Sequence, residues 1–290
     1  MIKLNDSPIE KIDFNGNSIY IKRDDLLNKE FSGNKARKLH YFLDKDYKHI
    51  TTLISHGSNQ SNAMYSLSVL AKIKNWKFIY YTNHIPSFLE QNPNGNYKYA
   101  LENGMNIIKD ENFDKKNISI DSKTLFISEG GAVKEAAYGI KILANEIKKF
   151  QSKYNIKNLN VFLPSGTGTT ALFLQKYLDI KVLTTPCVGD ALYLEKQFYQ
   201  LDDNKNNHPT IINPIKKYHF GKLYKENYMI YKEIKDKTSI EFDLLYDPIG
   251  WNTLLRNIDK NIEYLYIHQG GIIGNITMID RYKHKFNEFK

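Results

Sequence analysis

The chain has 290 residues, 41% of them apolar and 13% aromatic, which is enough to bury the core of one large α/β domain or of two lobes. No stretch approaches the ~18 consecutive apolar residues of a membrane span, and the first residues lack the pattern of a secretory signal, so we expect a cytoplasmic protein without a membrane partner. The formal charge of +9 comes from lysines scattered among Asn, Ile and Tyr, which favours solvated faces over a nucleic-acid-binding surface, and Cys187, the single cysteine, excludes an internal disulfide.

Strands and helices alternate along the chain, which predicts a wound, largely parallel sheet. In the first half, apolar periodicity predicts strands at residues 19–23, 52–55, 77–82 and 124–128, and helices at 34–45, 61–74, 97–103 and 134–150. In the second half, it predicts strands at 160–163, 181–185, 243–246 and 264–268, and helices at 170–177, 191–201, 223–235, 251–258 and 275–282. The polar stretch 202–208 is typical of a flexible loop.

Three turns rich in small or polar residues follow predicted strands and precede predicted helices, at residues 55–62, 165–170 and 268–271. In an open α/β sheet, ligands bind at this carboxyl edge. The second turn suits a phosphate, because backbone N–H groups and hydroxyls meet there at a helix start. Its Gly166-Thr167-Gly168 also fits a loose dinucleotide fingerprint, although no acidic residue ends the next strand. A plain turn without a ligand remains an alternative for this segment.

Lys35 follows Gly33-Asn34 just inside a predicted helix start. The positive end of the helix dipole disfavours a further positive charge there and lowers the pKa of the amine. An amine of lowered pKa is nucleophilic near neutral pH, as a Schiff-base lysine must be. A lone lysine is more often a surface residue, and the neighbouring Gly-Asn and Gly/Ser turns are what favour a functional role.

Several strings together resemble the 1-aminocyclopropane-1-carboxylate deaminase / D-cysteine desulfhydrase family. They are Lys22-Arg23-Asp24-Asp25, Ser32-Gly33-Asn34-Lys35-Ala36-Arg37-Lys38-Leu39, Asn59-Gln60-Ser61-Asn62, Glu129-Gly130-Gly131, the 165–170 turn, Asp247-Pro248 and His268-Gln269-Gly270-Gly271. They run almost from end to end and in order. The members are fold-type-II pyridoxal-phosphate enzymes related to tryptophan synthase β.

The resemblance implies two open, twisted, mostly parallel sheets flanked by helices. It places residues 1–40 and 150–290 in a large domain that binds pyridoxal 5'-phosphate, and residues 41–149 in a smaller inserted lobe. It also implies a homodimer. The implied activity is that of a deaminase, classed as a lyase or hydrolase, which converts a small amino acid to a 2-oxo acid and ammonia. No metal is implied.

The resemblance also assigns roles to individual residues. Lys35 matches the Schiff-base lysine, and Ser61 matches an acid/base residue near the substrate. Gln60, Ser61 and Asn62 match substrate-binding positions, and Asn62 also matches a contact to the cofactor phenolate. The phosphate positions are Gly166, Thr167, Gly168, Thr169 and Thr170. Gln269 is expected to face the pyridine nitrogen.

The sequence departs from the family pattern at two places. Ile249-Gly250-Trp251 follows Asp247-Pro248, where the family has Val-Tyr and then an acidic residue or Thr. Phe220 stands where a tyrosine precedes a glycine. Tyr218 and Trp251 are therefore our candidates for substrate binding, and cyclopropane ring opening is left open.

Three alternatives follow from the same residues. A D-cysteine desulfhydrase or an amino-acid racemase would keep Lys35 and Ser61. A nicotinamide-dependent oxidoreductase would use Gly166-Thr167-Gly168. A non-catalytic protein that binds nucleic acid would use the positive charge.

Overall fold

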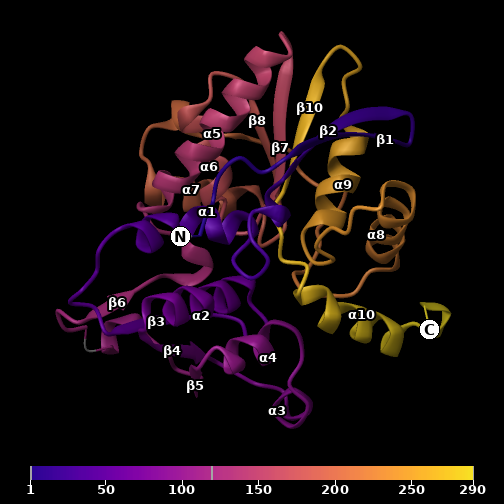
Figure 1. Ribbon diagram of the computed structural model, residues 1–290. Coiled ribbons are helices and arrows are strands. Elements are labelled where there is room, and N and C mark those ends of the chain that lie inside the picture. The colour runs from indigo at the N-terminus through magenta and orange to yellow at the C-terminus, as the bar shows by residue number, and fades with distance from the viewer. Residues whose placement is uncertain (1, 119, 290) are drawn as a thin grey trace.

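The computed structural model describes residues 2–118 and 120–289, which form two sheets with helices on their faces. The six-stranded sheet occupies the upper part of Figure 1 and the four-stranded sheet the lower left. The expected α/β class, with two mostly parallel sheets, is confirmed. None of the described helices combines the length and the apolar character that crossing a membrane would require.

The six-stranded sheet is built from both ends of the chain. Its strands are β1 (Ile9–Phe14), β2 (Asn17–Arg23), β7 (Leu159–Ser165), β8 (Val182–Pro186), β9 (Thr210–Ile211) and β10 (Glu263–His268). Their order is β1-β2-β10-β7-β8-β9, and only the β1–β2 pair is antiparallel. The last strand thus lies between β2 and β7, with Leu265 opposite Tyr20 and Val161.

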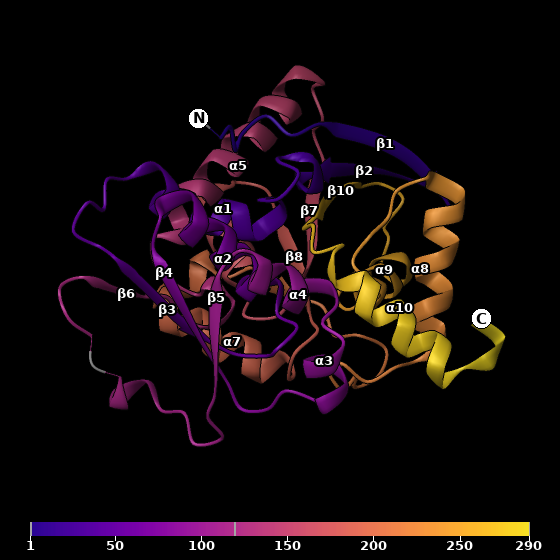
Figure 2. The ribbon, with the colours of Figure 1, turned by 60° about the horizontal axis from the view of Figure 1, so that its bottom comes forward.

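The four-stranded sheet comes from one continuous stretch of chain. Its strands are β3 (Thr52–His56), β4 (Lys77–Thr82), β5 (Met105–Lys109) and β6 (Thr124–Phe126), all parallel, in the order β5-β4-β3-β6. Figure 2 shows this sheet in front of the six-stranded one.

Ten α-helices are assigned in the described residues. They are α1 (Gly33–Asp44), α2 (Asn62–Lys74), α3 (Ser87–Gln91), α4 (Gly95–Glu102), α5 (Ala136–Lys153), α6 (Thr169–Tyr177), α7 (Ala191–Leu201), α8 (Lys225–Thr238), α9 (Asp247–Arg256) and α10 (Gly274–Lys285). The bounds of β4 and α7 coincide with those predicted from sequence, and most other predicted helices shift by a few residues at their ends.

Both faces of the six-stranded sheet are buried, as a parallel sheet requires. Side chains alternate along β10, so Leu265 and Ile267 join the core under α5 and α6, while Tyr264 and Tyr266 join the core under α8 and α9. A third core, under α1, α2 and α4, covers one face of the four-stranded sheet.

Helix α1 lies between the two sheets and contacts both sides. Its Leu39 and Phe42 belong to the core of the four-stranded sheet. On its other side it meets α5 so closely that a Cβ at Gly139 would lie 2.0 Å from the Arg37 carbonyl oxygen. Helix α5 packs its apolar residues against the six-stranded sheet. The boundary predicted at residue 149 therefore cuts through a helix that packs on the larger sheet.

A buried ionic cluster fixes the start of α1 to its surroundings. The Arg37 guanidinium donates to Asp24 at 2.8 and 3.0 Å and to both oxygens of Glu146 at 2.8 Å, and Lys22 Nζ lies 2.6 Å from Glu146. Arg37 is fully buried, so its positive charge needs the carboxylates of Asp24 and Glu146 as partners. The cluster ties α1 to α5 and to the end of β2.

The strand predicted at residues 243–246 is wrong: these residues form a turn that leads into α9. The Asp243 Oδ1 atom accepts from the backbone N–H groups of Leu245 and Tyr246, which closes the turn, and Pro248 then starts the helix. The loop predicted at 202–208 contains the short 3₁₀ helix Lys205–Asn207. Strands β1, β5 and β9 and helix α3 were not predicted.

Candidate functional site

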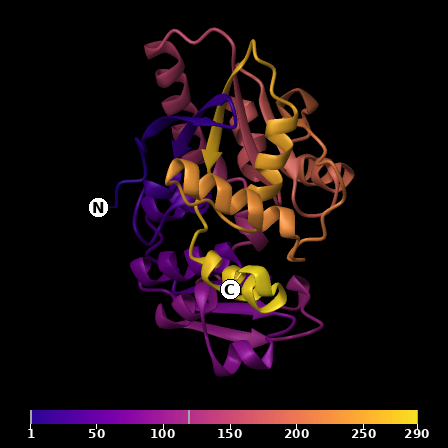
Figure 3. The ribbon, with the colours of Figure 1, turned by 90° about the vertical axis from the view of Figure 1, so that its right-hand side faces the viewer.

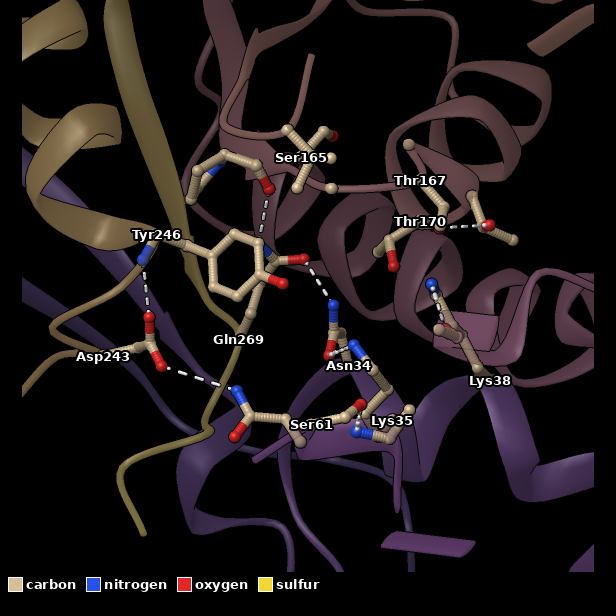
Figure 4. Close-up of a pocket in the computed structure, with 18 of the residues that line it drawn as sticks. Asn34, Lys35, Lys38, Ser61, Ser165, Thr167, Thr170, Asp243, Tyr246 and Gln269 are labelled. Atoms are coloured by element: carbon tan, nitrogen blue, oxygen red, sulfur yellow. Dashed lines mark hydrogen bonds between the residues drawn. The ribbon is translucent and has the colours of Figure 1, made fainter. Parts of the chain in front are cut away.

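A cavity of about 250 Å³ lies at the carboxyl ends of the strands, where the two sheets face each other. It takes in most of the residues singled out from sequence. Figure 4 shows Lys35, Ser61 and the turn after β7 around it, together with Gln269. Asn62 and Gly166 to Thr170 line it as well.

Lys35 enters the cavity because α1 begins directly against the turn after β10. Gly33, the first residue of α1, has φ +65°, and a Cβ there would lie 2.0 Å from the Gln269 carbonyl oxygen. That carbonyl also accepts from the Asn34 N–H at 3.0 Å. The close approach requires glycine at residue 33, and it places Lys35 on the first turn of the helix.

The Lys35 amine is buried, and its pKa is lowered to about 8 because burial disfavours the ammonium form, although the nearby Asp243 carboxylate opposes this. Its Nζ donates to Asn34 Oδ1 at 3.2 Å, and Asn34 Nδ2 donates to Gln269 Oε1 at 2.8 Å. Gln269 Nε2 in turn donates to the Pro164 carbonyl at 2.7 Å. A continuous hydrogen-bond chain thus orients both Asn34 and Gln269.

The turn after β7 presents an anion-binding geometry. Residues 165–168 lead into α6, whose N-cap Gly168 has φ +70°. The Thr167 and Thr169 hydroxyls hydrogen-bond to each other at 3.0 Å. The Thr170 hydroxyl is buried without a hydrogen-bond partner in the part of the chain that the structure describes. A buried, unpartnered hydroxyl at a helix N-terminus is what a bound phosphate would satisfy.

Lys38 is a second amine on the same wall of the cavity, and the role assignments from sequence did not include it. Its side chain is 3% exposed, and its Nζ donates to the Gly130 carbonyl at 3.0 Å. Burial, and then the charge of Lys35, hold the pKa of Lys38 well below its usual value. Its spacing of three residues from Lys35 on a helix was the available signal. Together the two amines make this part of the cavity attractive to an anion.

Ser61 and Asn62 line the opposite wall at the start of α2. Ser61 is the N-cap, and its Oγ accepts from the N–H groups of Ala63 at 3.1 Å and Met64 at 3.4 Å. Asn62 links two segments that are far apart in the sequence: its Oδ1 accepts from Asn96 of α4 at 2.7 Å, and its Nδ2 donates to Asp243 at 3.4 Å. Both side chains are therefore held in fixed orientations.

Asp243 and Tyr246 also line the cavity and were not found from sequence as site residues. Burial raises the pKa of Asp243 to about 6, against the opposing effect of its hydrogen bonds to the backbone amides of Tyr246 and Leu245. The Tyr246 ring packs against Phe220, with centroids 5.3 Å apart, and both reach the cavity. The signal for Asp243 was its position as a turn residue before Asp247-Pro248.

Three predicted substrate-binding residues lie outside the cavity lining. Gln60 directs its side chain to α4, where its Oε1 accepts from the Tyr97 N–H at 3.4 Å. Tyr218 is buried against Tyr224, with ring centroids 5.0 Å apart. Trp251 is fully buried in the core, stacked on Tyr266 at 4.5 Å. The structure thus brings neither aromatic side chain to the cavity.

Packing around the buried Tyr266 also explains why position 250 is a glycine. A Cβ there would lie 2.6 Å from the Tyr266 hydroxyl and 3.2 Å from Pro164. The Tyr266 hydroxyl in turn donates to Asp247 at 2.7 Å. A larger side chain at position 250 would push the Tyr266 hydroxyl away and break this hydrogen bond. The buried Tyr266 therefore accounts for a glycine at this position.

No family model matches the chain. The chain is 27% identical over 91% of its length, and 91% of the relative's, to a protein of Thermotoga maritima named "Putative 1-aminocyclopropane-1-carboxylate deaminase". It is 24% identical over 57% of its length to "Putative D-cysteine desulfhydrase 2, mitochondrial" of Oryza sativa subsp. japonica, of which the match covers 46%.

Among solved structures, the chain resembles one described as an ACC deaminase homologue. The TM-score is 0.76, the identity is 22%, and the match covers 100% of this chain and 96% of the other. The resemblance that the sequence motifs indicated is therefore confirmed, and the chain has the fold of the fold-type-II pyridoxal-phosphate enzymes.

Proposed function

We propose that the protein is a pyridoxal-phosphate-dependent deaminase or lyase that converts a small amino acid to a 2-oxo acid and ammonia, as a 1-aminocyclopropane-1-carboxylate deaminase does. The observation that carries the proposal is the Lys35 amine, buried in the cavity with a pKa lowered to about 8. An amine in this state can bond covalently to an aldehyde near neutral pH. The similarity to the Thermotoga maritima relative over nine-tenths of both chains supports it.

The residues around Lys35 fit the rest of the cofactor. The turn before α6 would hold the phosphate through its backbone N–H groups and through Thr170, whose hydroxyl is buried and unpartnered among the described residues. Lys38 would offset the phosphate charge, which would compensate for its own burial. Gln269, with its amide fixed by Asn34 and Pro164, would face the pyridine ring.

When bound, the cofactor would supply an electron sink for the bonding electrons released at the substrate α-carbon. The protein residues would position the substrate and move protons. The α2 N-terminus, with Ser61 and Asn62, would bind the substrate carboxylate, which the positive end of the helix dipole favours. Lys35, as a free amine near its pKa, would accept or return a proton at the α-carbon, and the Ser61 hydroxyl would serve as its partner.

The size of the cavity supports a small amino acid as the substrate. Its volume of about 250 Å³ is below that of most ligand pockets, and the cofactor would take part of it. The aromatic rings of Phe220 and Tyr246 narrow it further. A bulky side chain would find no room without movement of these rings.

The test is covalent labelling of Lys35. Protein loaded with pyridoxal phosphate should absorb as a yellow Schiff base, and hydride reduction followed by peptide mass spectrometry should find the tag on Lys35. The Lys35→Ala variant should lose both signals. Lys38→Met, measured at saturating pyridoxal phosphate, is the control, because it removes the other cavity amine and should keep the tag on Lys35. A tag on another lysine, or yellow absorbance in Lys35→Ala, contradicts the proposal.

A D-cysteine desulfhydrase is a second candidate, and an amino-acid racemase a third. The relative from rice supports the first of these. So do Gly250 and Phe220, which stand where the family has the tyrosines associated with ring opening. A panel of D- and L-amino acids with the cyclopropane substrate separates the candidates by their products: ammonia with 2-oxobutanoate, sulfide, or the opposite enantiomer.

A further inference from the structure

The two oxygens of the Asp243 carboxylate differ in how well they are hydrogen-bonded. Its Oδ1 accepts from the N–H groups of Leu245 at 2.8 Å and Tyr246 at 2.6 Å. Among the described residues, its Oδ2 has a single long hydrogen bond, 3.4 Å from Asn62 Nδ2. The residue is 4% exposed and lines the cavity. Figure 4 shows the Asp243 carboxylate joined by a dashed line to the backbone nitrogen of Tyr246.

The turn before α9 explains only the first oxygen. An Asn side chain would accept the same two backbone hydrogen bonds, since Asn and Asp close such turns equally well. A buried carboxylate costs more free energy than a buried amide unless something compensates its charge. Within the described residues no salt bridge joins Asp243 to a cation, and the cation that acts on it is Lys35. On the proposed function, Lys35 bonds to the cofactor and is not a lasting partner.

The position of Asp243 in the cavity indicates which part of a substrate it would contact. The turn before α6 and Lys38 suit the cofactor phosphate, and the α2 N-terminus suits the substrate carboxylate. The substrate α-carbon must lie within reach of Lys35. With those walls assigned, the substrate side chain would face the remaining wall of the cavity. That wall is formed by Asp243, Tyr246 and Phe220.

We propose that Asp243 determines specificity by accepting a hydrogen bond from the substrate side chain, so that the preferred substrates carry a hydroxyl or amine on the β-carbon. Side chains that lack a donor leave the buried Oδ2 atom without a partner, and carboxylate side chains meet like charge. This inference rests on the proposed function and deepens it by naming the substrate class. Serine is the simplest member of that class.

The reaction of serine balances without a further co-reactant. The Cβ–O bond breaks with its electron pair on oxygen, which takes up a proton and leaves as water, and the α-proton is lost. Water then hydrolyses the carbon–nitrogen bond, so that pyruvate and ammonia are the net products. Asp243 binds the hydroxyl in this scheme and transfers no electrons.

The experiment compares two ligands of equal shape on the holoenzyme. Serine carries a hydroxyl where 2-aminobutyrate carries a methyl group, and both enantiomers of each are titrated by the change in cofactor absorbance. Asp243→Asn keeps the turn and replaces the accepting Oδ2 with a donor. Asp259→Asn is the matched control, because Asp259 accepts from the Asn261 N–H at 2.9 Å in a turn that is exposed and outside the cavity lining.

We expect the wild type and Asp259→Asn to bind serine about tenfold or more tightly than 2-aminobutyrate, since a buried acceptor left unpaired rejects the analogue. In Asp243→Asn this ratio should fall, because the neutral amide offers the hydroxyl a weaker hydrogen bond than the carboxylate does. An unchanged ratio in a folded Asp243→Asn overturns the inference and leaves the proposed function intact. If the variant does not fold, the wild-type ratio decides alone, and equal binding overturns the inference. Failure of the holoenzyme to bind either ligand also overturns the inference, whereas failure of the protein to accept the cofactor refutes the proposed function itself.

Discussion

The lowered pKa of Lys35 predicts how fast the cofactor-free protein captures pyridoxal phosphate at different pH values. Only the neutral amine attacks an aldehyde, so the rate follows the neutral fraction of Lys35. With a pKa of about 8, about one-tenth of the amine is neutral at pH 7 and about nine-tenths at pH 9. The capture rate should therefore rise about tenfold between these pH values and then level off.

A lysine with an ordinary pKa of about 10.5 behaves differently over the same interval. Its neutral fraction rises about a hundredfold from pH 7 to pH 9, and it continues to rise at pH 10. The two cases differ in slope and in the presence of a plateau, so the comparison does not depend on the absolute rate constant.

The assay is stopped-flow absorbance after mixing the cofactor-free protein with excess pyridoxal phosphate between pH 7 and pH 10. This range lies above the second ionisation of the phosphate, near pH 6, which would otherwise change the charge of the ligand. Reductive tagging at each pH confirms that Lys35 is the residue modified. A rate that rises with unit slope through pH 10 would refute the reasoning, because burial would then not control this amine.

Three other predictions concern the surroundings of Lys35. Glu146→Gln leaves Arg37 without half of its counter-charge and should lower the free energy of unfolding in urea by about 3 kcal/mol. Gly33→Ala places a Cβ against the Gln269 carbonyl and should cost about 3 kcal/mol or prevent folding, as measured by circular dichroism and urea unfolding. Lys38→Met should weaken cofactor binding about tenfold or more without lowering the stability of the cofactor-free protein, because it removes a buried amine that has no counter-charge there.

Each of these variants has a reference that isolates the proposed cause. Asp179→Asn breaks a surface ion pair in which the carboxylate is 95% exposed, so it should cost less than about 0.5 kcal/mol. Gly16→Ala shares a positive φ of +71° but has open space around the new Cβ, so it measures backbone strain alone. Equal losses in Glu146→Gln and Asp179→Asn, or in the two glycine variants, would contradict the explanations. A Lys38→Met protein with unchanged cofactor affinity would remove Lys38 from the phosphate site.

Local signals in the sequence predicted much of the fold. The helix at 191–201 and the strand at 77–82 were found with their observed ends because periodicity and turn residues agree there. Strand β1 was missed because IEKIDF carries charges between its apolar residues. In the described part of the chain it also lies at a sheet edge and pairs with β2 alone. The predicted strand at 243–246 failed because the apolar Leu244-Leu245-Tyr246 follows an Asp that closes a turn instead.

The site residues also fall into two groups, those that local sequence patterns predict and those that long-range contacts place. Lys35, Ser61 and the turn before α6 follow glycines or begin helices, and such local marks are readable in one sequence. The surroundings of Asp243 depend on a contact between the turn before α9 and the start of α2. These segments are far apart in the sequence, so no local pattern predicts which side chains Asp243 meets. Trp251 was a candidate for substrate binding by its position in a motif, but its contacts with Tyr266 and the surrounding core decide its place.

Contacts made by the chain after β10 show how far the site depends on this later part of the sequence. After β10 the chain crosses to the smaller sheet, where α10 lies beside α4 in Figure 3 and Thr277 donates to Asn94 at 2.9 Å. The same crossing places Gly271 and Gly274 beside Asn62.

The place of β10 in the larger sheet has a consequence for the synthesis of the protein. A ribosome makes β2 and β7 long before residues 263–268, yet β10 fills the gap between those two strands. Until it is made, two strand edges stand open in the growing chain, where another nascent chain could pair with them. Gln269 reaches the start of α1 only after that insertion, so the cavity is complete only in a chain translated past β10. A chain that stops before β10 would carry most of the site residues and no site.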